Sequence, residues 1–159
     1  AVLFFIVISG AENNQFNKPA ALATAVMKLI KKSAMAIIRD NRLLVVRKRG
    51  SKDYLVPGGK PEGKETPVEA LARELKEEIG CSFDSASLAF LGYFEDFTSD
   101  GKAKVSIELF SGELVGEPKA SSEIEGLKWI SAADVINPFV TPIIRKQIMP
   151  FLVGKGMLK

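Results

Sequence analysis

The chain has 159 residues, of which 47% are apolar and 26% are charged, and its formal net charge is +3. This length and composition are typical of one globular domain with its own core. The sequence has no histidine and a single cysteine, Cys81, which excludes Ser-His and Cys-His catalysis, histidine-bound zinc and an internal disulfide. The mild, dispersed positive charge predicts no stable nucleic-acid binding and suits a small polyanionic ligand, and the lone cysteine favours a cytoplasmic location.

The N-terminal part of the chain differs from the rest. Residues 1–8 form an apolar run that is too short to span a bilayer and has no preceding basic segment, so we expect no membrane partner. Met27 resembles a native start. We therefore predict an N-terminal extension over residues 1–26, either a leader or a cloning-derived segment, and one globular domain over residues 27–159. An alternative is that the extension adds a strand or helix packed on a neighbour.

The first predicted elements of the domain are two strands. Ser33–Ile38 and Leu43–Arg49 are apolar runs, and the polar residues between them are typical of a turn. The pattern predicts an antiparallel hairpin.

A helix is predicted next, because Thr66 is a typical N-cap, Pro67 suits the first helical position and Glu69 completes a capping box. Gly80 is typical of the left-handed residue that ends a helix, which gives a length of about fourteen residues. A period of 3.6 residues places one apolar face toward the core, made of Val68, Leu71, Ala72, Leu75 and Ile79.

The second half of the chain predicts further strands and two helices. Leu88–Phe97 and Lys104–Leu114 form a hairpin through Asp100 and Gly101, and Leu127–Ile130 forms a short strand. Ser131 with Asp134 caps a short helix, and Thr141 with Pro142 begins a last helix that runs to about Leu152. Strands mixed with helices in this order predict an α+β layered domain.

Three carboxylates crowd the central helix. Glu74, Glu77 and Glu78 stand at i, i+3 and i+4, where their like charges repel. A solvated helix face is the simpler explanation for Glu77 and Glu78 alone. The alternative is a Mg²⁺ ion, since this cation is commonly held by one or two carboxylates together with substrate phosphates. Arg73 stands four residues before Glu77, where its guanidinium can orient a carboxylate.

The run GKPEGKETPVEALARELKEEIGC resembles the signature of the Nudix hydrolases, the MutT-like family. The matching positions are Gly59, Glu65, Arg73, Glu74, Leu75, Glu77, Glu78 and Gly80. Cys81 departs from the pattern, which has an aliphatic residue there. The resemblance covers about residues 29–153 and implies a Nudix-type α/β/α sandwich with a mixed central sheet. It also implies Mg²⁺-dependent hydrolysis, with Mn²⁺ as an alternative, of a pyrophosphate linkage in a nucleoside diphosphate derivative.

The resemblance also implies roles for individual residues. Glu77 and Glu78 resemble metal ligands, joined by the Gly58 carbonyl, and Glu74 resembles a ligand or the general base. Arg73 would orient these glutamates. An acidic residue on a later loop is expected at Glu123 in preference to Glu125. The remaining assignments are structural roles for Gly59, Glu65 and Gly80, and phosphate binding by Lys48 or Arg49, for which a solvated strand end is the alternative.

Several alternatives stay open. Gly58 to Lys64 also matches the start of a phosphate-binding P-loop, but Glu65 stands where that motif needs Ser or Thr, and Pro61 removes an N–H. By elimination among the subgroup markers of the family, a (d)NTP or a modified nucleotide is the expected substrate. ADP-ribose, a nucleotide sugar, or a non-catalytic nucleotide sensor are the alternatives. The sequence leaves a homodimer open.

Overall fold

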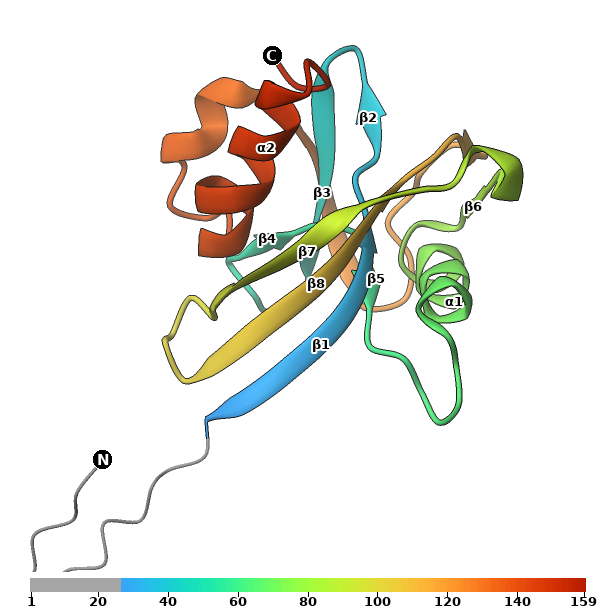
Figure 1. Cartoon of the computed structure of the whole chain (residues 1–159), viewed down its shortest axis with the longest axis horizontal. Coiled ribbons are helices and arrows are strands. Elements are labelled where there is room, and N and C mark those ends of the chain that lie inside the picture. Colours follow the sequence, from blue (N-terminus) through green and yellow to red (C-terminus); the bar gives the residue numbers. More distant parts are fainter. Residues whose placement is uncertain (1–26) are drawn as a thin grey trace, which may run out of the picture.

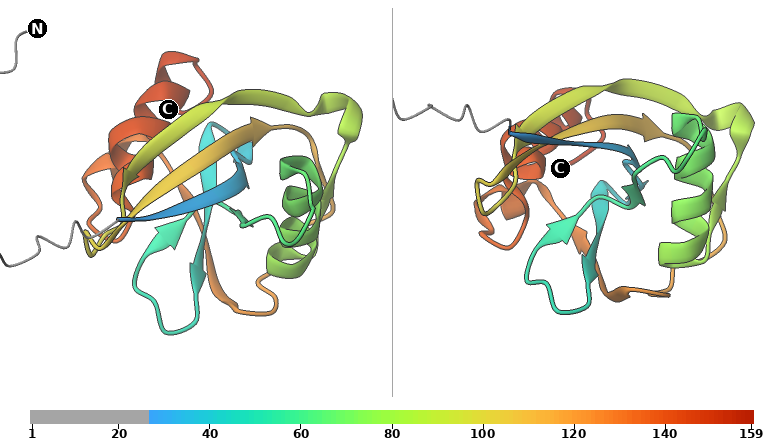
Figure 2. Two further views of the ribbon diagram at one scale, coloured as in Figure 1. Left: turned by 60° about the horizontal axis from the view of Figure 1, so that its bottom comes forward. Right: turned by 90° about the horizontal axis from the view of Figure 1, so that it is seen from below.

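The computed structural model describes residues 27–159, so the predicted N-terminal extension lies outside the described residues. Its strands form two larger sheets, with helix α1 (Pro67–Ile79) on one side and the C-terminal helices on the other, as Figure 1 shows. Figure 2 shows the same layers from two further directions. The predicted α+β class and the α/β/α arrangement with a mixed sheet are confirmed.

The first sheet is mixed and has the order β5-β1-β8-β7. Strand β1 (Lys28–Met35) runs parallel to β8 (Ala103–Ser111) and antiparallel to β5 (Gly58–Gly59). Strand β7 (Ala89–Phe97) pairs antiparallel with β8, as the predicted second hairpin requires. The hairpin's second strand ends at Ser111, since Leu114–Val115 forms a separate strand, β9, that pairs with β6 (Ser82–Phe83).

The second sheet corrects the first predicted hairpin. Strand β3 (Arg42–Lys48) pairs with the two-residue β2 (Ile38–Arg39), through a turn in which Asp40 and Asn41 have φ values of 51° and 57°. Prediction of one strand over Ser33–Ile38 was wrong, because the chain leaves β1 after Met35 and enters the other sheet. Strands β4 (Tyr54–Leu55) and β10 (Ile124–Ile130) complete this sheet against β3.

Helix α1 begins and ends as predicted. The Glu69 N–H donates to Thr66 Oγ1 at 3.2 Å, the Thr66 N–H donates to Glu69 Oε2 at 2.8 Å, and Gly80 has φ 68°. The predicted core face is only partly right, because Val68 and Ala72 are exposed. The buried stripe instead contains Ala70, Leu71, Leu75, Glu78 and Ile79. The helix packs on β1 and β5, which turns its glutamate-bearing side inward.

Three short helices close the chain. The 3₁₀ helix η2 (Ala132–Ile136) begins at the predicted cap, where the Ser131 N–H donates to Asp134 Oδ2 at 2.9 Å. The predicted last helix contains a π-helical segment, η3 (Ile144–Ile148), which continues into α2 (Met149–Gly154). Pro150 has no N–H to donate to the preceding turn, which is consistent with a local change of hydrogen-bond pattern there.

The core has two clusters, one on each side of the strands. One cluster joins α1 to Met35, Leu44 and Phe110, and the other joins η3 and α2 to the strand residues Leu43 and Leu109. Cys81 is buried in the first cluster, as expected of a small apolar residue. Within residues 27–159, no helix has both the length and the apolar character needed to cross a membrane.

Candidate active site

Two glycines let strand β5 lie close to its neighbours, Gly58 against strand β1 and Gly59 against helix α1. An ideal Cβ at Gly59 would lie 2.1 Å from Glu74 Oε1, and one at Gly58 would lie 2.1 Å from the Ser33 carbonyl oxygen. Gly58 also has φ 138°, a conformation that other residues rarely adopt. The absence of a side chain at Gly59 therefore creates the space in which the Glu74 carboxylate lies, and its absence at Gly58 allows the close pairing of β5 with β1.

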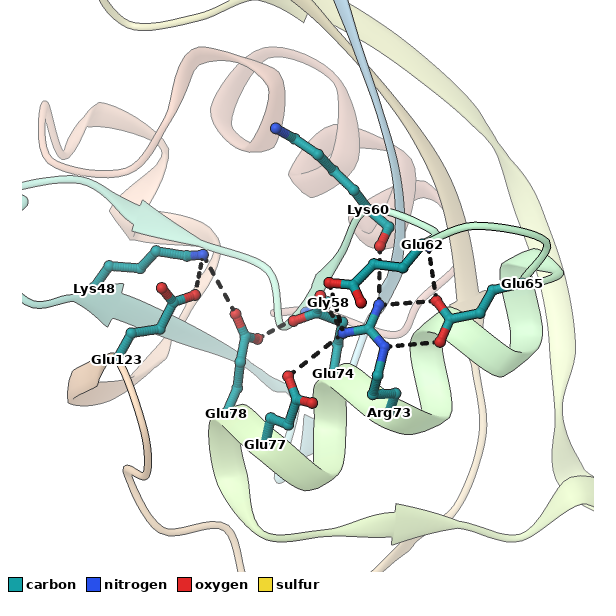
Figure 3. A network of polar contacts seen from close by, with 10 residues as sticks. All are labelled: Lys48, Gly58, Lys60, Glu62, Glu65, Arg73, Glu74, Glu77, Glu78 and Glu123. Atoms are coloured by element: carbon teal, nitrogen blue, oxygen red, sulfur yellow. Dashed lines mark hydrogen bonds and ion pairs between the residues drawn. The ribbon is translucent and has the colours of Figure 1, made fainter.

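Arg73 is the centre of a hydrogen-bond network at the start of α1 (Figure 3). Its guanidinium binds Glu65 through two bonds, Nε to Oε1 at 2.8 Å and Nη2 to Oε2 at 2.9 Å. It also donates to the Lys60 carbonyl at 3.0 Å and to Glu74 Oε1 at 2.9 Å, and Nη1 lies 3.4 Å from Glu77 Oε2. The bonds from Arg73 hold the pKa of the Glu65 carboxyl at about 2. Arg73 thus ties the loop before the helix to the glutamates on it.

Glu78 is the buried member of the cluster, with a side chain only 2% exposed. Its Oε2 accepts the Gly58 N–H at 2.9 Å, and its Oε1 lies 3.9 Å from Lys48 Nζ. Burial raises the pKa of Glu78 to about 7, although the Gly58 bond and Lys48 oppose this rise. Since the Gly58 N–H points at this carboxylate, it does not point at a bound phosphate as a P-loop amide would.

Glu123 lies beside these groups although it is distant in sequence. Its carboxylate accepts a hydrogen bond from Lys48, and the Arg49 N–H donates to its carbonyl at 2.8 Å. Glu125, the rejected alternative, instead pairs with Arg47 at 3.2 Å. Among the described residues, the exposed Arg49 side chain forms no ion pair or side-chain hydrogen bond, whereas Lys48 points toward Glu78 and Glu123 in Figure 3.

The acidic side chains are not gathered into a metal site here. In the part of the chain that the structure describes, no three or more Asp, Glu, Cys or His side chains lie together as metal ligands. Arg73 contacts Glu74 and Glu77, whereas Lys48 pairs with Glu123. The donor chemistry nonetheless fits a hard cation, since the donors are carboxylate oxygens. Glu78 is almost fully buried, and its nearest cationic group, Lys48 Nζ, is 3.9 Å away. Metal binding would require Glu77 and Glu123 to leave their protein partners.

An open cleft of about 380 Å³ lies beside these carboxylates. Its walls include three lysines, Lys32, Lys48 and Lys60, together with Glu62 and Glu74. Of these residues, Lys48 and Glu74 were predicted from the sequence, whereas Lys32, Lys60 and Glu62 were not. Lys60 and Glu62 lie inside the recognised motif at positions where any residue is accepted, and Lys32 lies in a strand 26 residues upstream of Gly58, so no local pattern marks them.

A smaller cavity of about 140 Å³ continues from the cleft between the two sheets and η3. Ile30, Lys32 and Leu55 line both spaces. Most of the cavity's other lining is apolar, but Asp53 and Thr141 also reach it. The Thr141 Oγ1 atom is buried and has no hydrogen-bond partner among the described residues. The cavity therefore offers a mostly apolar space with one buried, unpaired hydroxyl oxygen, that of Thr141.

Comparison with known proteins agrees with this geometry. The chain is 29% identical over 117 residues to a putative 8-oxo-dGTP diphosphatase of Bacillus subtilis, covering 72% of this chain and 74% of that protein. It is 45% identical over 53 residues to an RNA pyrophosphohydrolase of Halorhodospira halophila, a match that spans 33% of this chain and only 28% of that protein. Among solved structures, the MutT protein of Methanosarcina mazei has a TM-score of 0.66 at 22% identity, covering 82% of this chain and 97% of that one.

A model of the NUDIX domain matches residues 29–152, which include β1, the Arg73 network and the C-terminal helices. The resemblance inferred from the Gly59–Cys81 run is confirmed, and so is the expected enzyme class. The chain belongs to the Nudix hydrolase family.

Proposed function

We propose that this chain uses Mg²⁺ to hydrolyse a pyrophosphate linkage in a nucleoside diphosphate derivative, with a (d)NTP or a modified nucleotide as the first candidate. One observation carries the proposal. A cleft lined by three lysines and two glutamates adjoins a mostly apolar cavity, and the two spaces share lining residues. A nucleotide has two corresponding ends, a charged phosphate chain and an aromatic base whose faces are apolar and whose edges form hydrogen bonds.

The cleft is suited to the phosphate end. Lys48 and Lys60 supply positive charge at its walls, Glu74 lines it from the helix side, and Glu78 lies 3.9 Å from Lys48. Carboxylates alone would repel a polyphosphate. A divalent cation between them and the phosphates would neutralise charge on the phosphate oxygens and lower the pKa of a bound water.

The protein's own groups have distinct tasks in this proposal. Glu77, Glu78 and Glu123, with the Gly58 carbonyl, would hold the cation, and Glu74 would act as a further ligand or as the general base. Arg73 would fix the direction of the Glu74 carboxylate, since it also binds Glu65 with two hydrogen bonds. The Gly58 N–H would keep Glu78 in its ionised, inward orientation. Lys48 would exchange its pairing with Glu123 for a substrate phosphate.

The cavity is suited to the nucleoside end. Its volume of about 140 Å³ is comparable to an engineered cavity of about 150 Å³ that accepts benzene. Phe97 and Val105 offer apolar contact, and Asp53 and Thr141 can accept hydrogen bonds from a base. The names of the relatives, an RNA pyrophosphohydrolase and an 8-oxo-dGTP diphosphatase, support a phosphate anhydride of a nucleotide as substrate class.

The test is a phosphate-release screen with Mg²⁺ or Mn²⁺ over (d)NTPs, an oxidised dNTP, ADP-ribose, nucleotide sugars and dinucleoside polyphosphates. We expect turnover of at least one nucleoside triphosphate, and its loss in Glu78→Gln but not in the matched control Glu125→Gln. Turnover of ADP-ribose or a nucleotide sugar alone would replace the first candidate. Nucleotide binding without any turnover would indicate a sensor and refute the hydrolase proposal.

A further inference from the structure

Lys32 is a cation placed on an otherwise apolar inner face of β1. The alternation along the strand directs Ile30, Lys32 and Ala34 into the space between the sheets, where all three line the apolar cavity. Its neighbour Lys31 is exposed, and the same alternation directs its side chain toward the opposite side of the sheet, although both lysines line a hollow beside Ser33. The two lysines therefore differ in burial, and only Lys32 lines the apolar cavity.

Within the described part of the chain, Lys32 has no partner that would explain its position. No carboxylate within residues 27–159 forms an ion pair or a hydrogen bond with it, although Glu74 and Glu78 are near enough to influence it. Burial lowers the pKa of Lys32, and the nearby Lys48 lowers it further. An ammonium group here weakens the fold, because it loses hydration without gaining a direct salt bridge.

The location of Lys32 indicates which ligand group it could bind. Lys32 lines both the apolar cavity and the open cleft with Lys48, Lys60 and Glu74. A ligand that spans the two spaces must pass this side chain. If the ring of a nucleotide lies in the cavity and its distal phosphates lie beside the glutamates, the group at Lys32 is the phosphate attached to the sugar.

We propose that Lys32 binds the phosphate nearest the nucleoside and so makes the site selective for nucleotides over nucleosides before any metal is bound. This inference rests on the proposed function only for the direction in which the ligand lies. It assigns a substrate-binding role to a residue outside the family motif. The same contact would be kept by a nucleoside monophosphate after cleavage, so Lys32 would also hold a product.

The test measures binding without metal or turnover. Calorimetric titrations in EDTA would compare AMP, CMP, GMP and UMP with adenosine, cytidine, guanosine and uridine. For the monophosphate that binds best, we expect Lys32→Met to weaken binding by about tenfold to a hundredfold, the range of a charge-assisted hydrogen bond. Binding of the matching nucleoside should stay the same. Lys31→Met is the matched control and should change neither, and Lys32→Arg should restore part of the affinity.

Thermal unfolding separates this role from a structural one. If Lys32 only serves the fold, Lys32→Met should lower the unfolding midpoint, whereas the proposal expects an equal or higher midpoint because a costly charge is removed. Unchanged monophosphate affinity in Lys32→Met, equal losses for nucleoside and monophosphate, or no monophosphate binding by the wild type would each overturn the inference. A silent hydrolysis screen with selective loss of monophosphate binding in Lys32→Met would refute the proposed function and leave this inference standing.

Discussion

Substitution of Gly59 by alanine should abolish most catalysis and leave the fold intact. The new Cβ would lie 2.1 Å from Glu74 Oε1 and 2.2 Å from Glu74 Cδ, whereas ordinary contacts begin at 3.4 Å. The carboxylate must therefore move by more than about 1 Å. Because Glu74 is the flexible end of a side chain and Gly59 has no positive φ, the backbone can stay where it is.

The displacement should reduce activity more than stability. A shift of about 1 Å in a catalytic group can reduce the rate by about a hundredfold. The Arg73 bond to Glu74 would be lost or lengthened, but the two bonds from Arg73 to Glu65 do not depend on Gly59. We therefore expect kcat to fall by about a hundredfold, with a change in unfolding free energy of no more than about 1 kcal/mol.

Two nearby glycines are matched controls, Gly58 in β5 and Gly63 in the loop that follows it. Gly58→Ala should destabilise the protein strongly, because its Cβ would lie 2.1 Å from a backbone atom, the Ser33 oxygen, and because φ is 138°. An ideal Cβ at Gly63 would have no atom within 4 Å, so Gly63→Ala should lower the unfolding free energy only by the small strain of an alanine at φ 56°. The assay is kcat on the best substrate beside a urea unfolding curve. Full activity of Gly59→Ala would refute a catalytic need for the Glu74 position.

Three further predictions concern the charged groups around α1. Glu78→Gln should lower metal-dependent turnover by orders of magnitude in steady-state kinetics without lowering the unfolding midpoint, because the amide oxygen can still accept the Gly58 N–H. Glu65→Gln should remove a stabilisation that is present above pH 4.5 and is lost as the pH falls toward 2, because Arg73 lowers the folded-state pKa of Glu65. In thermal melts from pH 5 to 2, the midpoints of wild type and variant should therefore converge at the acid end. Lys48→Met should tighten Mn²⁺ binding severalfold in calorimetry, because Lys48 lies 3.9 Å from Glu78 and pairs with Glu123, the proposed metal ligands. The same change should raise KM, since Lys48 is also the proposed phosphate-binding residue. Weaker Mn²⁺ binding would show that Lys48 does not compete with the metal.

Features that depend on short stretches of sequence were predictable. The capping box at Thr66 and Glu69 and the left-handed Gly80 involve residues no more than a few positions apart, and all are found as expected. The Asp100 and Gly101 turn is equally local and forms the β7–β8 hairpin. The prediction of one strand over Ser33–Ile38 was wrong for the opposite reason, because the pairing there depends on residues far away in the sequence. The apolar run is continuous, but β1 pairs with β8, about 75 residues away, and only Ile38 and Arg39 pair with β3.

The glutamates show where prediction from helical periodicity stops. Spacing placed Glu74, Glu77 and Glu78 on one side of α1, and that is correct. Their exposed fractions are nevertheless 14%, 54% and 2%, because strand β5 covers one edge of that side and leaves the other edge open. The periodicity could not reveal β5, a strand of only two glycines.

The repulsion inferred among these carboxylates is already relieved within the protein. Arg73 contacts Glu74 and Glu77, and the Gly58 N–H and Lys48 face Glu78. The crowding of like charges therefore does not by itself demand a metal. The two cations that relieve the repulsion, Arg73 and Lys48, differ in how firmly they are held, and this difference supports metal binding better than the crowding does. Arg73 is fixed by Glu65, whereas Lys48 has a flexible side chain that is 34% exposed and can leave Glu78 and Glu123 for a phosphate. Under the proposed function, that difference would allow a cation and a polyphosphate to bind together, because Lys48 would transfer its pairing from Glu123 to a substrate phosphate.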